Sequence, residues 1–89
     1  MNKLEFARGP GSVIASADEH CLLIGDSWTV LIPRKDAIKY VHNYGSSPNE
    51  GFFEHDDKVM FSHNSGKIWF SLEEAQAIVN LIKSTYYPV

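Results

Sequence analysis

The chain has 89 residues, the length of one small domain, and 44% of them are hydrophobic, as in a globular protein. Its net charge of −3 argues against a general nucleic-acid binder, which needs a basic excess. Cys21 is the single cysteine, so no disulfide forms within the chain. Because no apolar leader and no long apolar run is present, the sequence predicts a cytoplasmic protein without a membrane span.

The first predicted unit covers residues 13–44. The segment GPGS, residues 9–12, resembles a cloning remnant, and residues 1–12 carry no function if they are vector-derived. Short β-branched runs bounded by polar turns predict strands over residues 13–16, 21–25 and 28–32, with turns at residues 17–20 and 26–27. A helix follows, with Pro33 at its first position and Gly45 as its C-terminal cap. Its apolar stripe is Ala37, Val41 and Tyr44, flanked by Ile38 and Tyr40.

After a linker over residues 45–51, the second predicted unit covers residues 52–85. Strands are expected over residues 52–55, 58–62 and 67–70, with turns at residues 56–57 and 63–66. Ser71 and Glu74 have the spacing of a capping box at the start of a helix. Its buried stripe is Ala75, Ile78, Val79 and Ile82, and Pro88 follows its end.

The two units match each other at a shift of 38 residues without a gap. Residues 10–44 and 48–82 share five identical pairs, where ordinary composition gives about two by chance. A fixed internal period is typical of repeated supersecondary units, although two unrelated hairpin–helix units would read similarly. We therefore expect an α+β fold of tandem βββα repeats, related by a pseudo-two-fold axis, with two helices on one face of a six-stranded antiparallel sheet.

Strand alternation sorts the side chains into two faces. The first face is apolar and is expected beneath the helices: Cys21, Leu23, Val30, Ile32, Val59, Phe61, Ile68 and Phe70. The second face should be polar in a half-solvated sheet, yet it carries Leu22, Ile24, Leu31, Met60 and Trp69. Three explanations are open: closure of the sheet on itself, dimerisation, or a binding platform. We expect this set to bind a protein partner or a second copy, with Trp69 as the anchor.

The sequence predicts no catalytic residue, no cofactor and no metal site. His55 and His63 lie at opposite ends of one expected strand, too far apart for one zinc ion. A cluster of His20, His55 and Asp57 is conceivable, but it matches no known ligand spacing. Cys21 lies inside an expected strand, and no phosphate-binding glycine loop is present.

The first turn of the helix that follows Pro33 carries Arg34 and Lys35, and Lys39 lies one turn on. Cations are unfavourable at a helix N-terminus, so they suggest a site for a small anion such as a nucleotide. The strand and helix over residues 66–84 also resemble in outline the last strand and helix of the positive-cofactor type of single-stranded-DNA binder, which implies nucleic-acid binding by an aromatic sheet face. The basic residues for such a face are missing.

Small, mildly acidic chains without a catalytic motif are common among regulators and inhibitors, including those encoded by phages and other mobile elements. The sequence therefore favours a non-enzymatic protein that binds a protein partner. The alternative is a module that binds a small ligand, a nucleotide or single-stranded nucleic acid.

Overall fold

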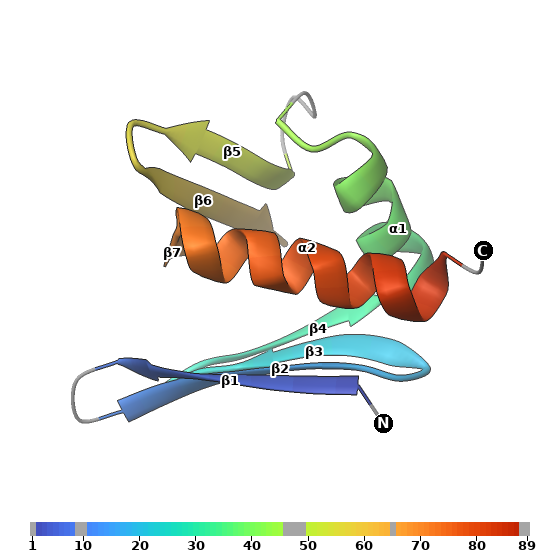
Figure 1. Ribbon diagram of the computed structural model, residues 1–89, viewed down its shortest axis with the longest axis horizontal. Helices are drawn as coiled ribbons and strands as arrows, with labels where there is room; N and C mark the ends of the chain where they lie inside the picture. The colour runs from blue at the N-terminus through green and yellow to red at the C-terminus, as the bar shows by residue number, and fades with distance from the viewer. Residues whose placement is uncertain (1, 9–10, 46–49, 65, 88–89) are drawn as a thin grey trace.

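The computed structural model describes residues 2–8, 11–45, 50–64 and 66–87 and has an α+β fold (Figure 1). Four strands form one antiparallel sheet in chain order: β1 (Asn2–Arg8), β2 (Gly11–Ala17), β3 (His20–Ile24) and β4 (Thr29–Pro33). Three more form a second antiparallel sheet: β5 (Gly51–His55), β6 (Lys58–His63) and β7 (Gly66–Ser71). The helices are α1 (Arg34–His42), which follows β4, and α2 (Leu72–Tyr86), which follows β7.

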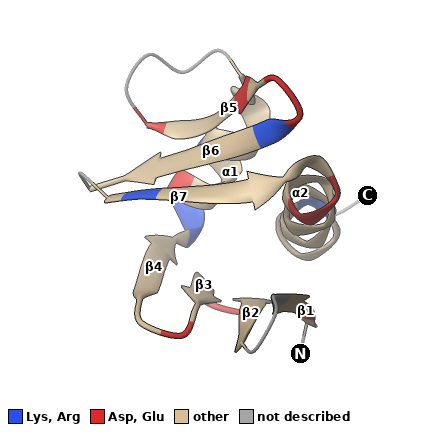
Figure 2. Ribbon diagram, turned by 90° about the vertical axis from the view of Figure 1, so that its left-hand side faces the viewer, with Lys and Arg blue, Asp and Glu red and all other residues tan. Residues whose placement is uncertain are grey.

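The prediction of one six-stranded sheet is wrong, because the seven strands form two sheets. β4 and β7 are both edge strands, and no ladder between them joins the sheets. The helices lie between the sheets: α1 packs on β3, β4 and β5, and α2 packs on β1, β2, β6 and β7. Figure 2 shows α2 end-on in the angle between the two sheets. Both sheets thereby cover the same pair of helices, which a single flat sheet could not do.

The extra strand lies in the segment to which the sequence assigned no structure. β1 pairs with β2 along its whole length, from Asn2 opposite Ala17 to Arg8 opposite Gly11. Leu4 and Phe6 are partly buried against the core, while Lys3 and Glu5 are exposed. This alternation is the pattern of an edge strand with one face on the core. Gly9 and Pro10 of the GPGS segment lie outside the described residues.

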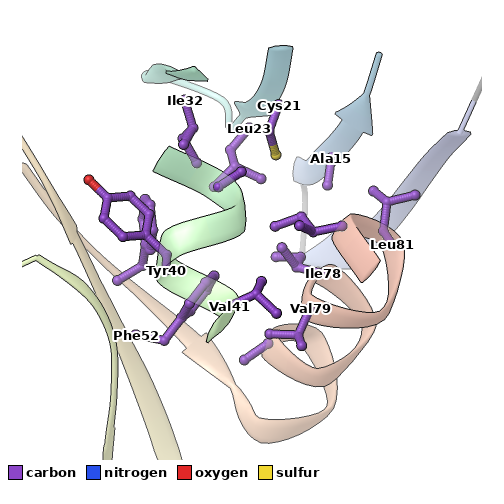
Figure 3. Packing of buried hydrophobic residues seen from close by; sticks show 14 of the residues in the cluster. Ala15, Cys21, Leu23, Ile32, Tyr40, Val41, Phe52, Ile78, Val79 and Leu81 are labelled. Carbon is purple, nitrogen blue, oxygen red and sulfur yellow. The ribbon is translucent and has the colours of Figure 1, made fainter. Parts of the chain in front are cut away.

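The core is built from the predicted first face of the strands and the stripes of both helices (Figure 3). The cross-strand pairs Cys21–Ile32 and Val59–Phe70 are each at most 1% exposed. The predicted stripe of α2 is fully confirmed, and the buried set extends to Leu81 and Tyr86. Strand alternation therefore predicted correctly that the first face packs on the core, and helix periodicity predicted the stripe of α2. Ser62 is an exception, because alternation places it on the second face although it is only 6% exposed.

Three details of the first helix differ from the prediction. Pro33 is the last residue of β4 and the N-cap of α1, not its first helical residue. The helix ends at the C-cap Asn43, so Tyr44 lies beyond it and stacks on Phe52, with ring centroids 5.6 Å apart. Gly45 is therefore not the cap. Its φ of 78° instead turns the chain so that its N–H donates to the Phe52 carbonyl at 3.0 Å.

The second helix begins as predicted. The Ser71 hydroxyl accepts a hydrogen bond from the Glu74 N–H at 3.1 Å, and the Glu74 carboxylate accepts one from the Ser71 N–H at 2.9 Å. This reciprocal pair satisfies two of the amide groups that a helix N-terminus leaves unpaired. The start of α2 is thus fixed by local sequence alone.

Candidate functional site

The exposed side of the β5–β7 sheet, which we call the outer face, carries an apolar row across all three strands. Phe53 lies opposite Met60 on β6, and Met60 lies opposite Trp69 on β7. A hollow of about 540 Å³ lies over this row and is lined by Phe53, Glu54, His55, Met60, Ser62, Lys67 and Trp69. Trp69 remains 47% exposed, although a buried tryptophan would add far more to the stability of a small domain.

Polar and charged residues border this apolar row on both sides. The neighbouring row at one end of the sheet consists of the exposed residues His55, Lys58 and Ser71. The row at the other end is formed by Gly51, Ser62 and Lys67, of which only Lys67 is exposed. The His55 ring lies 6.5 Å from the Trp69 ring, between centroids, and its Nε2 is 3.7 Å from the Asp56 carboxylate. An apolar centre with a polar rim is the usual anatomy of a protein-binding surface.

The structure divides the five predicted partner-binding residues between the two sheets. Met60 and Trp69 are cross-strand neighbours on the outer face. Leu22 lies opposite Leu31 on the four-stranded sheet, where Ile24 lies one pair further along, opposite Thr29. Leu31 is 54% exposed, whereas Leu22 and Ile24 are half-buried. The five therefore do not occupy one sheet face.

Phe53 belongs to the outer face but was missed by the sequence reasoning. The signal was present: a two-residue turn at Asp56–Asp57 places His55 opposite Lys58, and therefore Phe53 opposite Met60. Asp56 has a φ of 57°, which aspartate tolerates in a tight turn. Extending the face assignment through this turn would have included Phe53.

A hydrogen-bonded group lies where α1 meets the β6–β7 turn. The Tyr40 hydroxyl lies 2.7 Å from His63 Nδ1 and donates to the Glu50 carboxylate at 3.4 Å. The other Glu50 oxygen accepts from the Asn64 N–H at 2.9 Å. This backbone bond, together with the nearby His63, Tyr40 and Lys39, lowers the pKa of Glu50 and keeps it ionised at neutral pH. Burial and the Glu50 charge raise the pKa of Tyr40 to about 12.

His63 is only 8% exposed, which the sequence did not suggest. Its Nε2 is buried and has no hydrogen-bond partner among the described residues. An unsatisfied buried polar atom costs about 1–3 kcal/mol, so native proteins keep few of them without a functional reason. His63 is therefore a second candidate functional residue.

The predicted anion-binding cations contact aromatic rings of the protein itself. The Arg34 guanidinium carbon lies 5.4 Å from the Tyr86 ring centroid, and Lys39 Nζ lies 5.8 Å from that of Tyr40. Lys35 is exposed. Two of the three cations are thus directed to different rings, and the anion site stays a prediction.

Within the described ranges, no group of three or more His, Cys, Asp or Glu side chains is placed to hold a metal ion. His20 and His55 are both exposed, at the start of β3 and the end of β5. Burial raises the pKa of the Cys21 thiol to about 12, so this thiol stays protonated and unreactive at neutral pH.

Among the described residues, no helix is long and apolar enough to cross a membrane. Comparison with known proteins adds no family: no family model, no curated protein and no solved structure matches the chain.

Proposed function

We propose that this chain is a small, non-enzymatic interaction protein, a regulator or inhibitor, that binds a protein partner through its outer face. One observation carries the proposal: Trp69 is half-exposed beside Met60 and Phe53, over a hollow of about 540 Å³. Tryptophan is enriched among the residues that contribute most to binding energy, especially where it lies in a concave apolar centre.

The rim supports a protein partner over a small substrate. Lys58 and Lys67 are exposed on either side of the apolar row, and Asp56 and Asp57 are exposed in the adjoining turn. Such mixed charges suit the complementary rim of a protein interface and influence partner choice and association rate. A nucleic-acid platform would need a cationic surface instead.

We also propose that the fold arose from an internal duplication, with a first unit at residues 13–44, a linker at 45–51 and a second unit at 52–85. The 38-residue shift relates buried residues to buried residues: Cys21 to Val59, Leu23 to Phe61, Ile32 to Phe70, Ala37 to Ala75 and Val41 to Val79. Under the same shift, β2, β3 and β4 correspond to β5, β6 and β7. α1 packs on β3, β4 and β5, and α2 packs in the corresponding way on β6, β7 and β2. β1 has no counterpart in the second unit. The duplication predicts that a chain of two copies of residues 51–87 folds cooperatively.

The binding proposal is tested with Trp69→Lys and the control Gln76→Lys. The control adds the same charge at an exposed position of α2. All three proteins, the parent included, are used for affinity capture from the native host and for light scattering. The parent and the control are expected to retain the same partner, or the same dimer mass, which Trp69→Lys loses.

Trp69→Lys is expected to stay folded, because its side chain is already half-exposed. If it unfolds, Trp69 is a core residue and the outer face is not a surface for binding. If it stays folded and retains its mass and every partner, the proposal is wrong. Saturable quenching of Trp69 fluorescence by a single-stranded oligonucleotide would favour the nucleic-acid alternative.

A further inference from the structure

The β1–β4 sheet has one uncovered side, which we call the four-strand face. Both helices pack on the other side of this sheet, and Figure 1 shows no described element beneath it. The strand register places two rows of side chains on the four-strand face: Lys3, Ser16, Leu22 and Leu31 in the first row, and Glu5, Ile14, Ile24 and Thr29 in the second.

The centre of this face is apolar. Ile14 lies opposite Ile24, and Leu22 lies opposite Leu31, so these four side chains form one patch across three strands. Leu31 is 54% exposed, and the other three are half-buried. The solvent side of an antiparallel sheet is normally polar, and a contiguous apolar patch with a polar border is typical of an interaction site.

β1 supplies the only charged side chains of the two rows. Lys3 lies at the β1 end of the first row, and Glu5 lies at the β1 end of the second; both are exposed. β1 has no counterpart in the second unit, so the β5–β7 sheet has no equivalent of this pair. Two adjacent rows with opposite charges at the same end are complementary to each other.

We propose that the four-strand face binds a second copy of this chain, face to face, across a two-fold axis that runs between the two rows. The axis places each row over the other row of the second copy. Lys3 then faces Glu5 of the second copy, Leu22 faces its Ile24, and each contact occurs twice by symmetry. Packed sheets lie about 10 Å apart and cross at about 30°, which the long Lys3 and Glu5 side chains can span.

This inference goes beyond the proposed function, because it uses the other sheet and leaves Trp69 free for a different partner. It also gives a role to Leu22, Ile24 and Leu31, which the structure separates from the outer face.

The size of the four-strand face predicts weak association. Four strands about 4.8 Å apart, with up to seven residues at about 3.3 Å each, cover roughly 400 Å² per copy. Stable interfaces bury about 800 Å² per partner. We therefore expect a dissociation constant on the order of 10 μM, with monomer at about 1 μM chain and dimer at about 100 μM.

The first test is sedimentation velocity of the parent protein over this range, extended to about 1 mM chain. A shift from the monomer mass to the dimer mass is expected. A monomer at every concentration would overturn the proposal.

The second test reverses the two charges. Lys3→Glu and Glu5→Lys each place like charges opposite one another at two positions, and each should weaken dimerisation about tenfold or more. The double variant Lys3→Glu/Glu5→Lys should restore the parental dissociation constant. An equimolar mixture of the two single variants should also dimerise, because opposite charges then meet at both positions.

Both sites are exposed, so these variants are expected to stay folded. Lys83→Glu is the matched control, since it makes the same change of charge at an exposed position of α2 and should leave the dimer unchanged.

The third test concerns the apolar centre. Ile24→Thr keeps a β-branched side chain in the strand but removes apolar surface, and it should weaken dimerisation about tenfold. An unchanged dissociation constant in Ile24→Thr would place the dimer contact elsewhere and refute the four-strand face.

The outcomes separate the two proposals. Dimerisation that the single charge reversals leave unchanged, or that the double variant does not restore, would refute the four-strand dimer. A dimer lost in Trp69→Lys and kept in Lys3→Glu would assign self-association to the outer face and also refute it. A Trp69→Lys protein that keeps its dimer mass but captures no partner would support both proposals, whereas one that keeps its dimer mass and its partner would refute the outer face alone.

Discussion

The capping box of α2 gives the most exact prediction of stability. Ser71→Ala removes the hydroxyl that accepts from the Glu74 N–H at 3.1 Å, while the bond from the Ser71 N–H to the Glu74 carboxylate needs no serine side chain. One helix-terminal amide therefore loses its partner. Ser71 lies outside the helix as its N-cap, so alanine gains nothing there from its high helix propensity. Because the site is exposed, water replaces part of the bond, and we expect a loss of about 1 kcal/mol.

For a domain of this size, 1 kcal/mol corresponds to about 4–8 °C in the melting temperature. The assay is urea unfolding followed by circular dichroism, with the slope against urea unchanged between variants. Ser84→Ala is the matched control in the same helix. Its hydroxyl donates to the Leu81 carbonyl at 3.0 Å, a bond inside the helix whose loss is offset by the better helix propensity of alanine.

Ser84→Ala should therefore change the free energy of unfolding by less than about 0.5 kcal/mol. Ser71→Asp should retain most of the parental stability, since aspartate is an equally good N-cap. Equal losses in Ser71→Ala and Ser84→Ala would show that the capping bond does not stabilise α2, and the reasoning would fail.

The remaining predictions concern the core, the thiol and the helix N-terminus. Leu23→Ala, at a fully buried position, should lower the free energy of unfolding by about 2–5 kcal/mol, whereas Leu31→Ala, at a position 54% exposed, should lower it by about 0.5 kcal/mol or less. Similar losses in urea unfolding would contradict the assignment of Leu23 to the core and of Leu31 to the surface. Burial raises the pKa of Cys21 from 9.0 to about 12, so the thiol of the unfolded chain ionises first and the free energy of unfolding should fall as the pH rises from about 9 toward 12. This fall should be shallower in Cys21→Ala, and an identical fall in both proteins would refute the thiol as its cause. If Arg34 and Lys35 belong to an anion site, phosphate should raise the melting temperature of the parent and not of the double variant Arg34→Glu/Lys35→Glu; a parent without a phosphate response, together with a more stable double variant, would show only a relieved helix dipole.

Local sequence was sufficient for the β3–β4, β5–β6 and β6–β7 hairpins and for the start of α2, but not for the hairpin of β1 and β2. Two-residue turns and strict alternation set the register that pairs Met60 with Trp69 and Leu22 with Leu31, because a slip of one residue would expose the apolar face. The Ser71–Glu74 spacing set the helix start, because a capping box involves only four consecutive residues. The prediction of the first helix was less accurate, because Tyr44 fitted the helical period but lies beyond the helix end, where it stacks on Phe52.

The candidate sites were predicted less well than the elements. Trp69 and Met60 could be placed together from their alternation and pairing within one hairpin. The same reasoning could not place Leu22, Ile24 and Leu31 beside Trp69, because that placement assumed a single sheet. The approach of His63 to Asp36 and β4 was not predictable, because the β6–β7 turn is distant in the chain from residues 29–36 and meets them only through packing of the helices against both sheets.

The sequence by itself determined which residues pair within the hairpins of residues 20–33 and 51–71, which side chains of their first face point inward, and where α2 begins, since these depend on interactions between near neighbours. Only the tertiary structure decided that the strands divide into two sheets, that residues 2–8 complete one of them, and that β4 and β7 remain edges. The physical reason is that the helices must be covered on both sides. The helix stripes show which residues are buried, but not which of two sheets buries them.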